Sequence, residues 1–496
     1  MDFLSIAIFI SVTIFFVQYL GFFVTRSSKN LPPGPNPLPI IGSLHLIGDQ
    51  PHRSMFTLAN KYGPLMALKL GQITTIVISS STMAKEVLQK QDLAFSSNRT
   101  VPNALLAIDY YNYSLGFLPI GPKWTAIRKT MTSFVFSNNK INANKHLRME
   151  KVQEFIEYCF KCSQKGEAVS IGLGAFITSL NLLSNTIFSK DIVGWNSDNS
   201  REFYNLVRNF TMEGGKPNLA DFFPVFGRFD PQGIRHRTAI VTTKLHIFAE
   251  KLVDERLEQR KQGLVMNDML DVLLDSMETN PEDMDKQTIV YICQDMFVAG
   301  TDASSNTVEW AISEAVKNPD IMRKAKEELA HVIGKGKTIE EDDVDKLPYL
   351  RCVVKETFRL HPVAPFLIPR KVRQNDVQLS GFTIPKGSQV LVNAYAIGRD
   401  PSIWESPLEF KPERFWNSEI DVRGQHFELI PFGAGRRICP GLPLGLKMVH
   451  LMLGSLLNSF DWKLQGDIVP KTLNMDERFG MILQRAEPLL VVPVIS

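Results

Sequence analysis

The sequence predicts a mostly α-helical body with small β-sheets, attached to a single N-terminal membrane anchor. Apolar residues recur at helical spacing over long stretches of the chain, whereas β-branched runs bounded by turn residues are few and short. The first two dozen residues form an almost continuous apolar run. Apolar residues make up 44% of the 496 and charged residues 22%, which supports a large packed core and excludes wholesale disorder.

The apolar run from Phe3 to Val24 predicts the anchor. A helix over these 22 residues, rising about 1.5 Å per residue, reaches roughly 33 Å and can cross the hydrocarbon core of a bilayer. The run is too long for the apolar region of a signal peptide, no basic segment precedes it, and no small-residue cleavage site is clear, so an uncleaved anchor is favoured. Asp2 lies before the run and Arg26 and Lys29 lie after it, so the positive-inside rule places the rest of the chain in the cytosol.

A proline-rich segment divides the chain into three predicted parts. Residues 26–40 contain prolines at 32, 33, 35, 37 and 39. Such a segment lacks the amide hydrogens that a helix needs and favours extended backbone, so it is expected to be a stiff hinge. The hinge would join a transmembrane segment, residues 1–25, to one catalytic domain, residues 41–496. Beyond residue 40 no comparable linker, repeat or low-complexity tract occurs, which favours one large domain over three small ones.

Within the catalytic domain, the pattern predicts two small sheet segments and several long helices. Leu65–Leu70 and Ile73–Ile78, separated by a Gly-Gln turn, predict a β-hairpin. Gly381–Ile384 and Gln389–Val392, joined across a Pro-Lys-Gly turn, are expected to form another short sheet segment. Helical periodicity marks His146–Lys161, Thr238–Gln262, Lys286–Lys317, Pro319–Val332 and Leu442–Phe460.

Charge and cysteine content narrow the partners and the compartment. The formal net charge is +3, from 55 Lys+Arg and 52 Asp+Glu, whereas a nucleic-acid-binding protein normally concentrates a larger basic excess. No nucleic-acid partner is therefore expected. The 5 cysteines are scattered and odd in number, which indicates a reducing compartment rather than a disulfide framework. Cys159 and Cys162 form a lone C-x-x-C without a second ligand pair, so helix packing is favoured over zinc binding.

The stretch Phe432–Gly441 (FGAGRRICPG) predicts the chemistry of the protein. Its glycines allow the backbone to approach a large planar ligand closely. Pro440 suits the first position of the apolar helix that follows, which would place Cys439 at a helix N-terminus, where the dipole and free amides favour a thiolate. Arg437 is available to an anionic edge of the same ligand. A cysteine buried in a turn is the ordinary alternative, but the five fixed residues of Phe-x-x-Gly-x-Arg-x-Cys-x-Gly coincide by chance at a rate on the order of 1 in 10,000.

This stretch resembles the haem-binding signature of the cytochrome P-450 monooxygenases, and the other landmarks of that family occur in the expected order along the chain. Glu356-Thr357-Phe358-Arg359 matches the Glu-x-x-Arg helix, and Pro412–Phe415 matches the segment whose arginine, Arg414, completes a Glu-Arg-Arg cluster. Glu356 and Arg359 are three residues apart and share a helix face. The resemblance implies the cytochrome P-450 fold, with this cluster as structural support for the haem face.

The resemblance also implies haem b, with the Cys439 thiolate as the axial ligand of the iron. A Trp-x-x-x-Arg helix and two later arginines match positions that bind the haem propionates in the family, and the signature phenylalanine belongs beside the haem. The residues expected to contact the haem are Trp124, Arg128, Arg370, Phe432 and Arg437.

The segment Ala299–Ser304 (AGTDAS) matches the oxygen-activating helix of the family. The resemblance implies that Asp302 belongs to the proton-delivery route for O–O cleavage. The family most often has a threonine directly after this acid, whereas this chain has Ala303. Three interpretations stay open: Ser304 or Thr301 holds the water instead, a substrate hydroxyl holds it, or the enzyme releases more reduced oxygen than its relatives. A water held by Ser304 or by the substrate is favoured, with Asp302 and Ser304 as the candidate catalytic residues.

The segments that line the substrate pocket in the family are largely apolar here, which suits a small hydrophobic substrate. The expected substrate contacts are Phe297, Ala364, Phe366 and Met481. Asp221–Gln232, Tyr349–Arg359 and Ala394–Asp400 resemble a plant endoplasmic-reticulum group that includes geraniol hydroxylases and ferruginol synthases. The resemblance implies hydroxylation of a terpenoid, with an abietane-type diterpenoid as the first choice and a monoterpenol as the alternative.

The resemblance to this group implies residence in the endoplasmic reticulum membrane, with a cytosolic catalytic domain that uses O2 and takes electrons from NADPH through a flavoprotein reductase. Candidate docking residues for an acidic reductase are Lys123, Lys129 and Lys140. A haem-thiolate isomerase or dehydratase, which needs neither dioxygen nor a reductase, stays as an alternative. The acid at 302 argues against it, and the alanine at 303 weakens that argument. A haem sensor or carrier without catalytic activity is a further alternative.

Overall fold

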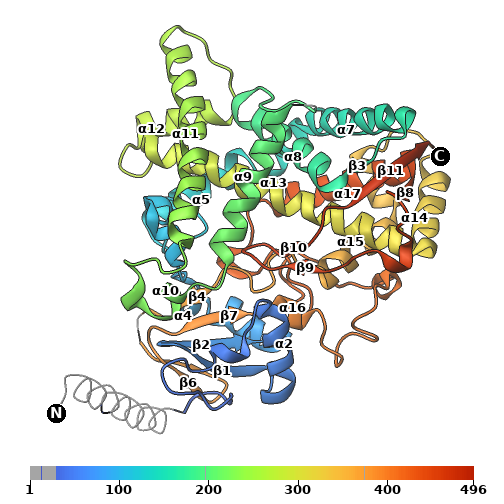
Figure 1. Cartoon of the computed structure of the whole chain (residues 1–496). Helices are drawn as coiled ribbons and strands as arrows, with labels where there is room; N and C mark the ends of the chain where they lie inside the picture. Colours follow the sequence, from blue (N-terminus) through green and yellow to red (C-terminus); the bar gives the residue numbers. More distant parts are fainter. Residues whose placement is uncertain (1–12, 14–29, 196, 374, 496) are drawn as a thin grey trace, which may run out of the picture.

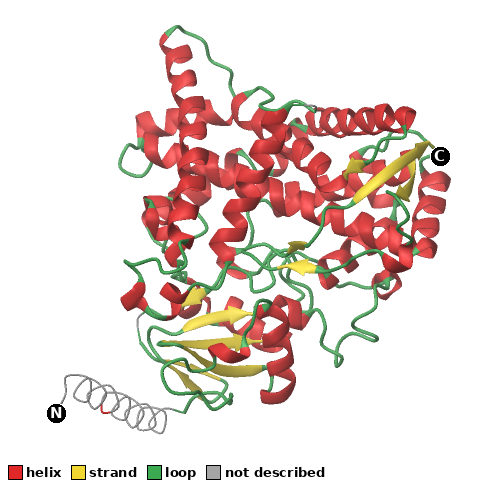
Figure 2. Ribbon diagram, in the orientation of Figure 1, coloured by secondary structure: helices red, strands yellow, loops and turns green. Residues whose placement is uncertain are grey.

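The computed structural model describes Thr13 and residues 30–195, 197–373 and 375–495. In this part of the chain a large helical body adjoins a smaller lobe that contains most of a four-stranded sheet (Figures 1 and 2). Apart from Thr13, the predicted anchor Phe3–Val24 lies outside the described residues. Among the described helices, only α8 (Ile171–Phe188) is long and apolar enough to cross a membrane. Because 83% of it is buried inside the protein, α8 is a core helix.

The helical body contains long helices at its centre and shorter ones around them. The helices longer than ten residues are α2 (Pro51–Tyr62), α5 (Pro122–Phe134), α7 (Lys145–Lys165), α8 (Ile171–Phe188), α9 (Asp198–Gly215), α11 (Ile234–Lys261), α12 (Met269–Thr279), α13 (Lys286–Lys317), α14 (Pro319–Val332), α15 (Pro348–Leu360) and α17 (Leu442–Ser459). The shorter ones are α3 (Ser81–Lys85), α4 (Asp92–Ser96), α6 (Asn138–Ala143), α10 (Leu219–Phe222) and α16 (Ala394–Ile397). Short 3-10 segments include η3 (Asn103–Ala107), η4 (Asp109–Asn112), η7 (Pro412–Phe415) and η8 (Gly435–Arg437).

The long helices lie where periodicity predicts them. α13 and α14 have the predicted bounds, and α7 and α11 extend the predicted ranges by about one turn at one end. Capping explains the limits of α13. The side chain of Asp285 accepts a hydrogen bond from the Thr288 amide at 2.7 Å at the N-terminus. At the C-terminus, Pro319 begins the next helix, because proline is favoured in a first turn and disfavoured inside a helix.

The four-stranded sheet has the order β1-β2-β7-β4. Its strands are β1 (Leu65–Leu70), β2 (Ile73–Ile78), β7 (Gln389–Val392) and β4 (Arg370–Lys371). The predicted hairpin is confirmed, because β1 and β2 are antiparallel with Leu65 opposite Ile78. The remaining small sheets are formed by β5 (Val377–Leu379) with β6 (Phe382–Ile384), by β9 (Glu477–Arg478) with β10 (Gln484–Arg485), and by β3 (Val169–Ser170), β11 (Leu490–Ile495) and β8 (Phe460–Leu464).

The pairing expected for Gly381–Ile384 with Gln389–Val392 is wrong. β6 pairs with β5, whereas β7 runs parallel to β2 and antiparallel to β4. Val390, Leu391 and Val392 are all buried, so β7 reads as a continuous apolar run. Such a run is typical of a strand that is covered on both faces and has neighbours on both sides.

The proline-rich segment packs against the sheet lobe over its described part, residues 30–40. The carbonyl of Pro33 accepts a hydrogen bond from the Ala67 amide at 2.8 Å. A Cβ on Gly34 would lie 2.0 Å from the Ala67 carbonyl oxygen, so only glycine allows this approach. The Asn30 side chain donates to the Gly381 carbonyl at 2.7 Å. The described part of the expected stiff hinge is therefore held against the sheet lobe, because prolines suit the edge of a sheet, where a missing donor costs little.

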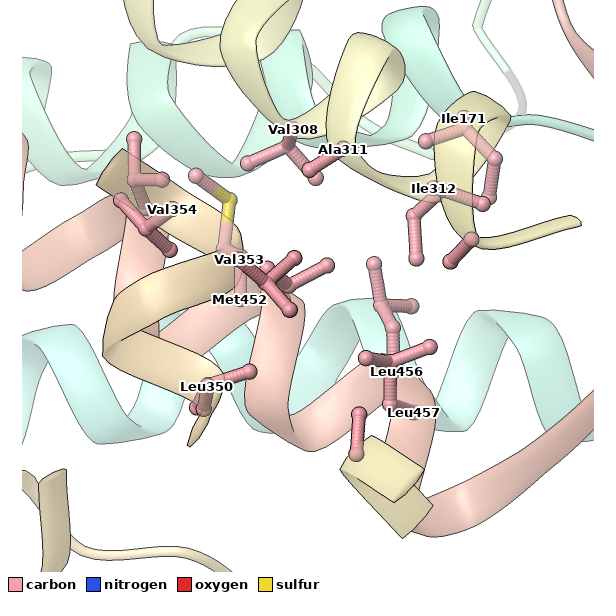
Figure 3. Packing of buried hydrophobic residues seen from close by; sticks show 14 of the residues in the cluster. Ile171, Val308, Ala311, Ile312, Leu350, Val353, Val354, Met452, Leu456 and Leu457 are labelled. Atoms are coloured by element: carbon pink, nitrogen blue, oxygen red, sulfur yellow. The ribbon is translucent and has the colours of Figure 1, made fainter. Parts of the chain in front are cut away.

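Four helices form the core that positions the site. α13 packs closely against α8, because a Cβ on Gly300 would lie 2.6 Å from Leu183 Cδ1. Gly300 therefore serves close helix packing, and α13 continues as one helix through it. On its other side α13 meets α15 and α17 (Figure 3). The side chains that come together there include Val308, Ala311, Ile312, Val353, Val354, Met452 and Leu456. This packing fixes α13 relative to the loop that precedes α17.

Candidate functional site

Cys439 lies in the loop that leads into α17. Gly433 and Gly435 both have φ of +70°, in the left-handed region, and a Cβ on Gly435 would lie 2.0 Å from the Leu88 carbonyl oxygen. The Cys439 amide donates to the Phe432 carbonyl at 2.9 Å, which closes the loop. The glycines thus serve the tight turn and close approach that the sequence predicts.

The expected helix start at Pro440 is wrong. α17 begins at Leu442, with Gly441 as its N-cap residue, so Cys439 precedes the cap. In this position the backbone amides of Gly441 and Leu442 donate toward the sulfur. Burial raises the pKa of the Cys439 thiol, whereas these amides and the positive charge of Arg128 lower it. The loop therefore offers hydrogen bonds and charge to a thiolate, the form that binds metal ions.

Four arginines gather beside this loop. Burial lowers the pKa of Arg370 to about 9, with a further contribution from Arg437. Burial and then Arg128 lower the pKa of Arg437 to about 10. The pKa of Arg99 is also lowered by burial and by Arg370 and Arg437. In the described part of the chain, none of these four arginines forms an ion pair with a carboxylate. Their positive charges repel one another, which disfavours the protonated form of each.

Arg437 and Arg99 are held by backbone carbonyls. Arg437 donates to Ser96 and Leu118 carbonyls at 2.6 Å each, and its guanidinium lies 5.2 Å from the ring centroid of Trp124. Arg99 donates to the Ile368 carbonyl at 2.6 Å, but its Nε is buried without a hydrogen-bond partner. Buried cations are costly unless an anion lies among them.

The residues present fit haem b. One sulfur is available as an axial ligand, and the positive arginine cluster is opposite in charge to the two propionates of haem. Arg99 was not found from the sequence, where it lies inside an ordinary Asn-Arg-Thr stretch. A β-bridge between Arg99 and Arg370 brings it to the cluster, and this pairing joins segments far apart in the chain.

One face of α13 lies beside the Cys439 loop. Between Thr288 and Val316, the residues that are not buried are Asp295, Ala299, Gly300, Ala303 and Ser304. Spacings of four residues place them on one side of the helix. Ser304 Oγ and the Phe432 ring both lie 3.9 Å from the position that a Cβ on Gly445 would occupy, so this face adjoins the start of α17. Its small side chains leave room for a planar cofactor and a small substrate.

Asp302 points to another side of α13. Its Oδ2 accepts hydrogen bonds from Thr211 Oγ1 and Gln484 Nε2, both at 2.9 Å. Burial raises the pKa of Asp302, whereas Thr211, Arg208 and Gln484 lower it. The structure does not bring Asp302 and Ser304 together, because residues two apart on a helix face different directions.

Thr301 does not hydrogen-bond to Asp302 either. Its hydroxyl donates to the Phe297 carbonyl at 2.5 Å, within the same helix. Neither hydroxyl considered from the sequence therefore pairs with Asp302. The residues that do, Thr211 and Gln484, come from α9 and β10, and no sequence motif links either of them to Asp302.

The expected substrate contacts divide into two groups. The ring of Phe297 lies 5.8 Å from Phe188, 5.9 Å from Phe203 and 6.1 Å from Phe248, between α8, α9 and α11. We therefore reassign Phe297 to the helical core. The sequence pattern could not distinguish these two positions for Phe297, because an apolar residue that packs in a core and one that lines a pocket have the same periodicity.

The other expected contacts lie nearer the ends of α9 and β7. Phe366 is buried in a cluster with Leu391 and packs edge-on against Phe479, with ring centroids 6.0 Å apart. Met481 packs against Gly214 at the end of α9. Ala364 is partly exposed in the turn before Phe366.

The Glu-Arg-Arg cluster is assembled as the sequence predicts. Glu356 accepts from Arg359 Nε at 2.7 Å and from Arg414 Nε at 3.0 Å. Arg359 also donates to the Pro407 and Glu409 carbonyls at 2.7 and 3.0 Å. The cluster thus ties α15 to the segment that leads toward Cys439.

The remaining candidates lie outside the site. Cys159 and Cys162 are both buried in α7, in the position of packing residues. Lys129 and Lys140 are exposed on α5 and α6. Lys123 instead lies 4.1 Å over the ring of Tyr113.

Comparison with known proteins agrees with this geometry. A family model for cytochrome P450 matches residues 32–492. The chain is 59% identical over 493 residues to geraniol 8-hydroxylase of Catharanthus roseus, covering 99% of each protein. It is 53% identical over 474 residues to geranylhydroquinone 3''-hydroxylase of Arnebia euchroma, covering 95% of each. It is 41% identical over 496 residues to ferruginol synthase of Salvia miltiorrhiza, covering 99% of each. The predicted fold is confirmed, and the chain belongs to the cytochrome P450 family, the haem-thiolate monooxygenases.

Proposed function

We propose that this protein hydroxylates an acyclic monoterpenol such as geraniol, with Cys439 as the ligand of the haem iron. The observation that carries the substrate class is the higher identity to geraniol 8-hydroxylase, 59%, than to ferruginol synthase, 41%. This reverses the order expected from the sequence, in which an abietane-type diterpenoid came first. Short stretches of sequence that geraniol hydroxylases and ferruginol synthases share do not distinguish these two groups of enzymes, whereas identity over the whole chain does.

The proposed reaction converts R–H, O2, NADPH and a proton into R–OH, water and NADP+. The haem, when bound, supplies the activation of dioxygen. Cys439 binds the iron, the arginine cluster of Arg99, Arg128, Arg370 and Arg437 orients the haem through its propionates, and apolar side chains exclude water from the substrate. A flavoprotein reductase delivers the two electrons of NADPH, and exposed Lys129 and Lys140 offer it positive charge.

Asp302 is the proposed proton donor and acceptor of the site. It is 2% exposed and lies one residue from the accessible face of α13. Burial raises the pKa of its carboxyl group, which brings proton uptake and release closer to neutral pH.

Membrane attachment in the endoplasmic reticulum, with a cytosolic catalytic domain, belongs to the same proposal. Ile40 is 57% exposed and lies beside the β1–β2 turn. The Gln72 amide of that turn donates to the Phe222 carbonyl at 2.9 Å, and Val225 and Phe229 beyond it are 65% and 75% exposed. α10 lies on the same side of the molecule as the sheet lobe (Figure 1). Exposed apolar side chains on this side of the molecule suit contact with lipid.

The substrate assignment predicts the outcome of a turnover assay. Full-length protein with reductase and NADPH is expected to hydroxylate geraniol, with one oxygen atom from 18O2. An abietane hydrocarbon is expected to have a kcat/KM lower by about 10-fold or more, because a pocket shaped for a flexible C10 chain must clash with a rigid tricycle. Faster oxidation of the abietane would reverse the assignment. Rearrangement of a fatty-acid hydroperoxide without NADPH would instead favour the isomerase.

The proposed orientation predicts an absence of N-glycans. Asn98, Asn112 and Asn209 lie in acceptor patterns, and the latter two are exposed. In eukaryotic membranes the protein is expected to keep its gel mobility after endoglycosidase treatment, since a cytosolic domain does not meet the glycosylating enzymes. An N-terminal extension with an acceptor pattern, placed in the lumen by the anchor, serves as the positive control. Sugar on Asn112 or Asn209 would contradict the orientation.

A further inference from the structure

The hydroxyl that pairs with Asp302 comes from a different helix. Thr211 of α9 and Asp302 of α13 are both 2% exposed, and Thr211 Oγ1 lies 2.9 Å from Asp302 Oδ2. The same hydroxyl is 3.1 Å from the Arg208 carbonyl and 3.3 Å from the Val207 carbonyl of its own helix. The carboxylate contact is the shortest and the only one with a charged acceptor, so the single hydroxyl proton belongs there.

Gln484 completes the support of the carboxylate. Its Nε2 donates to the same Asp302 Oδ2 at 2.9 Å, and its Oε1 accepts from Arg208 Nε at 2.9 Å. The amide therefore links the Arg208 cation to the Asp302 carboxylate without direct contact between them. Arg208 in turn donates to the Tyr204 hydroxyl at 2.6 Å. Within the described residues no donor reaches Asp302 Oδ1, so the two carboxylate oxygens differ.

The charged groups around Asp302 balance. Arg208 and the phenol of Tyr204 face Asp302 from α9. Glu309 lies on α13 and accepts a hydrogen bond from the Leu489 amide at 2.8 Å. Arg485 follows Gln484 in β10. α8, which packs against α13, carries no ionisable side chain. Two carboxyl groups, Asp302 and Glu309, and two guanidinium groups, Arg208 and Arg485, thus form a nearly neutral set. The ionisation of Asp302 then depends on burial, which favours the neutral acid, and on its two donors, which favour the carboxylate.

We propose that Thr211 is a positioning residue that replaces the alcohol missing at Ala303. Together with Gln484 it fixes Asp302 by Oδ2, stabilises the ionised form, and leaves Oδ1 as the oxygen that exchanges protons. This inference rests on the proposed role of Asp302 in proton delivery. It differs from the interpretations left open by the sequence, since Ser304 and Thr301 contribute nothing to Asp302.

Thr211→Val, which removes the hydroxyl at nearly constant volume, tests the proposal. With a normal reduced carbon monoxide spectrum, kcat for geraniol is expected to fall about 10-fold at pH 7. Loss of a donor raises the pKa of Asp302, so the acidic limb of the kcat–pH profile moves to higher pH. Thr211→Ser is expected to restore both. The control is Thr242→Val, because Thr242 is 1% exposed and donates to the Thr238 carbonyl of its own helix at 2.7 Å.

Thermal unfolding gives a readout that needs no turnover. The pKa of Asp302 is raised in the folded state, so the folded protein binds more protons and loses stability as pH rises between the unfolded and folded values. Thr211→Val raises the pKa of Asp302 in the folded protein further, so the pH range over which stability falls extends to higher pH. The loss in Tm from Thr211→Val is therefore expected to be larger at pH 8 than at pH 5, and to become independent of pH in an Asp302→Asn background.

The two measurements separate the two claims. Unchanged kcat in Asp302→Asn would overturn the role of Asp302 in proton delivery, while the pH dependence of Tm still reports whether Thr211 controls its ionisation. If Thr211→Val lowers Tm equally at both pH values and leaves the kcat–pH profile in place, Thr211 only packs, and the inference is wrong.

Discussion

Cys439→Ser is expected to abolish the spectral signature of thiolate-bound haem and to lower kcat by at least about 1,000-fold. The loop holds the side chain where the amides of Gly441 and Leu442 and the charge of Arg128 stabilise an anion. A thiol ionises under this influence when a metal ion binds, whereas a serine hydroxyl, a far weaker acid, stays neutral and is a poor ligand for iron. The reduced carbon monoxide difference spectrum and geraniol turnover measure the two effects.

A second cysteine provides the control for this experiment. Cys352 in α15 is also buried, at 5% exposure, but it lies in the core away from the arginine cluster. Cys352→Ser is expected to keep the thiolate spectrum and most of the activity, at some cost in stability from burying a hydroxyl. If instead Cys439→Ser kept the spectrum and Cys352→Ser lost it, the axial ligand would be Cys352.

The parts of the site that could be predicted are those encoded by neighbouring residues. The Phe432–Gly441 loop depends on glycines and a cap within ten residues, and the Glu356–Arg359 pair depends on one helix turn. Such local geometry can be read from spacing. Thr211 and Gln484 are 91 and 182 residues from Asp302, so their contacts follow from how helices and strands pack and leave no trace in spacing.

The fold shows the same division. Helices such as α13 follow from the 3.6-residue period of their own apolar side chains. The partner of β7 could not be predicted, because β2 lies more than 300 residues earlier in the chain and nothing local favours it over the adjacent β6. Phe297 shows the corresponding limit for the site, since an apolar residue on α13 faces either the core or the substrate.

Glu356→Gln is expected to lower the free energy of unfolding by about 3–5 kcal/mol, the usual effect of breaking a buried ion pair. The Glu356 side chain is 0% exposed and accepts hydrogen bonds from Arg359 at 2.7 and 2.8 Å, from Arg414 at 3.0 Å and from the Lys411 amide at 2.7 Å. The neutral amide of the variant leaves the buried guanidinium groups of Arg359 and Arg414 without a counterion. Its NH2 group also faces the N–H donors of these arginines, where the carboxylate had an acceptor. Urea denaturation followed by circular dichroism measures the loss, and haem retention after gel filtration is expected to fall with it.

Glu413→Gln is the matched control, because it removes an equal charge from an exposed ion pair in the same region. Glu413 in η7 lies 2.6 Å from Lys324, and both side chains are nearly half exposed. Solvent screens such a pair, so the expected loss is below about 1 kcal/mol. A similar small loss from both variants would mean that water or backbone movement relieves the buried arginines. The cluster would then be dispensable for holding α15 against the segment that leads to Cys439, and haem retention would not distinguish the two proteins.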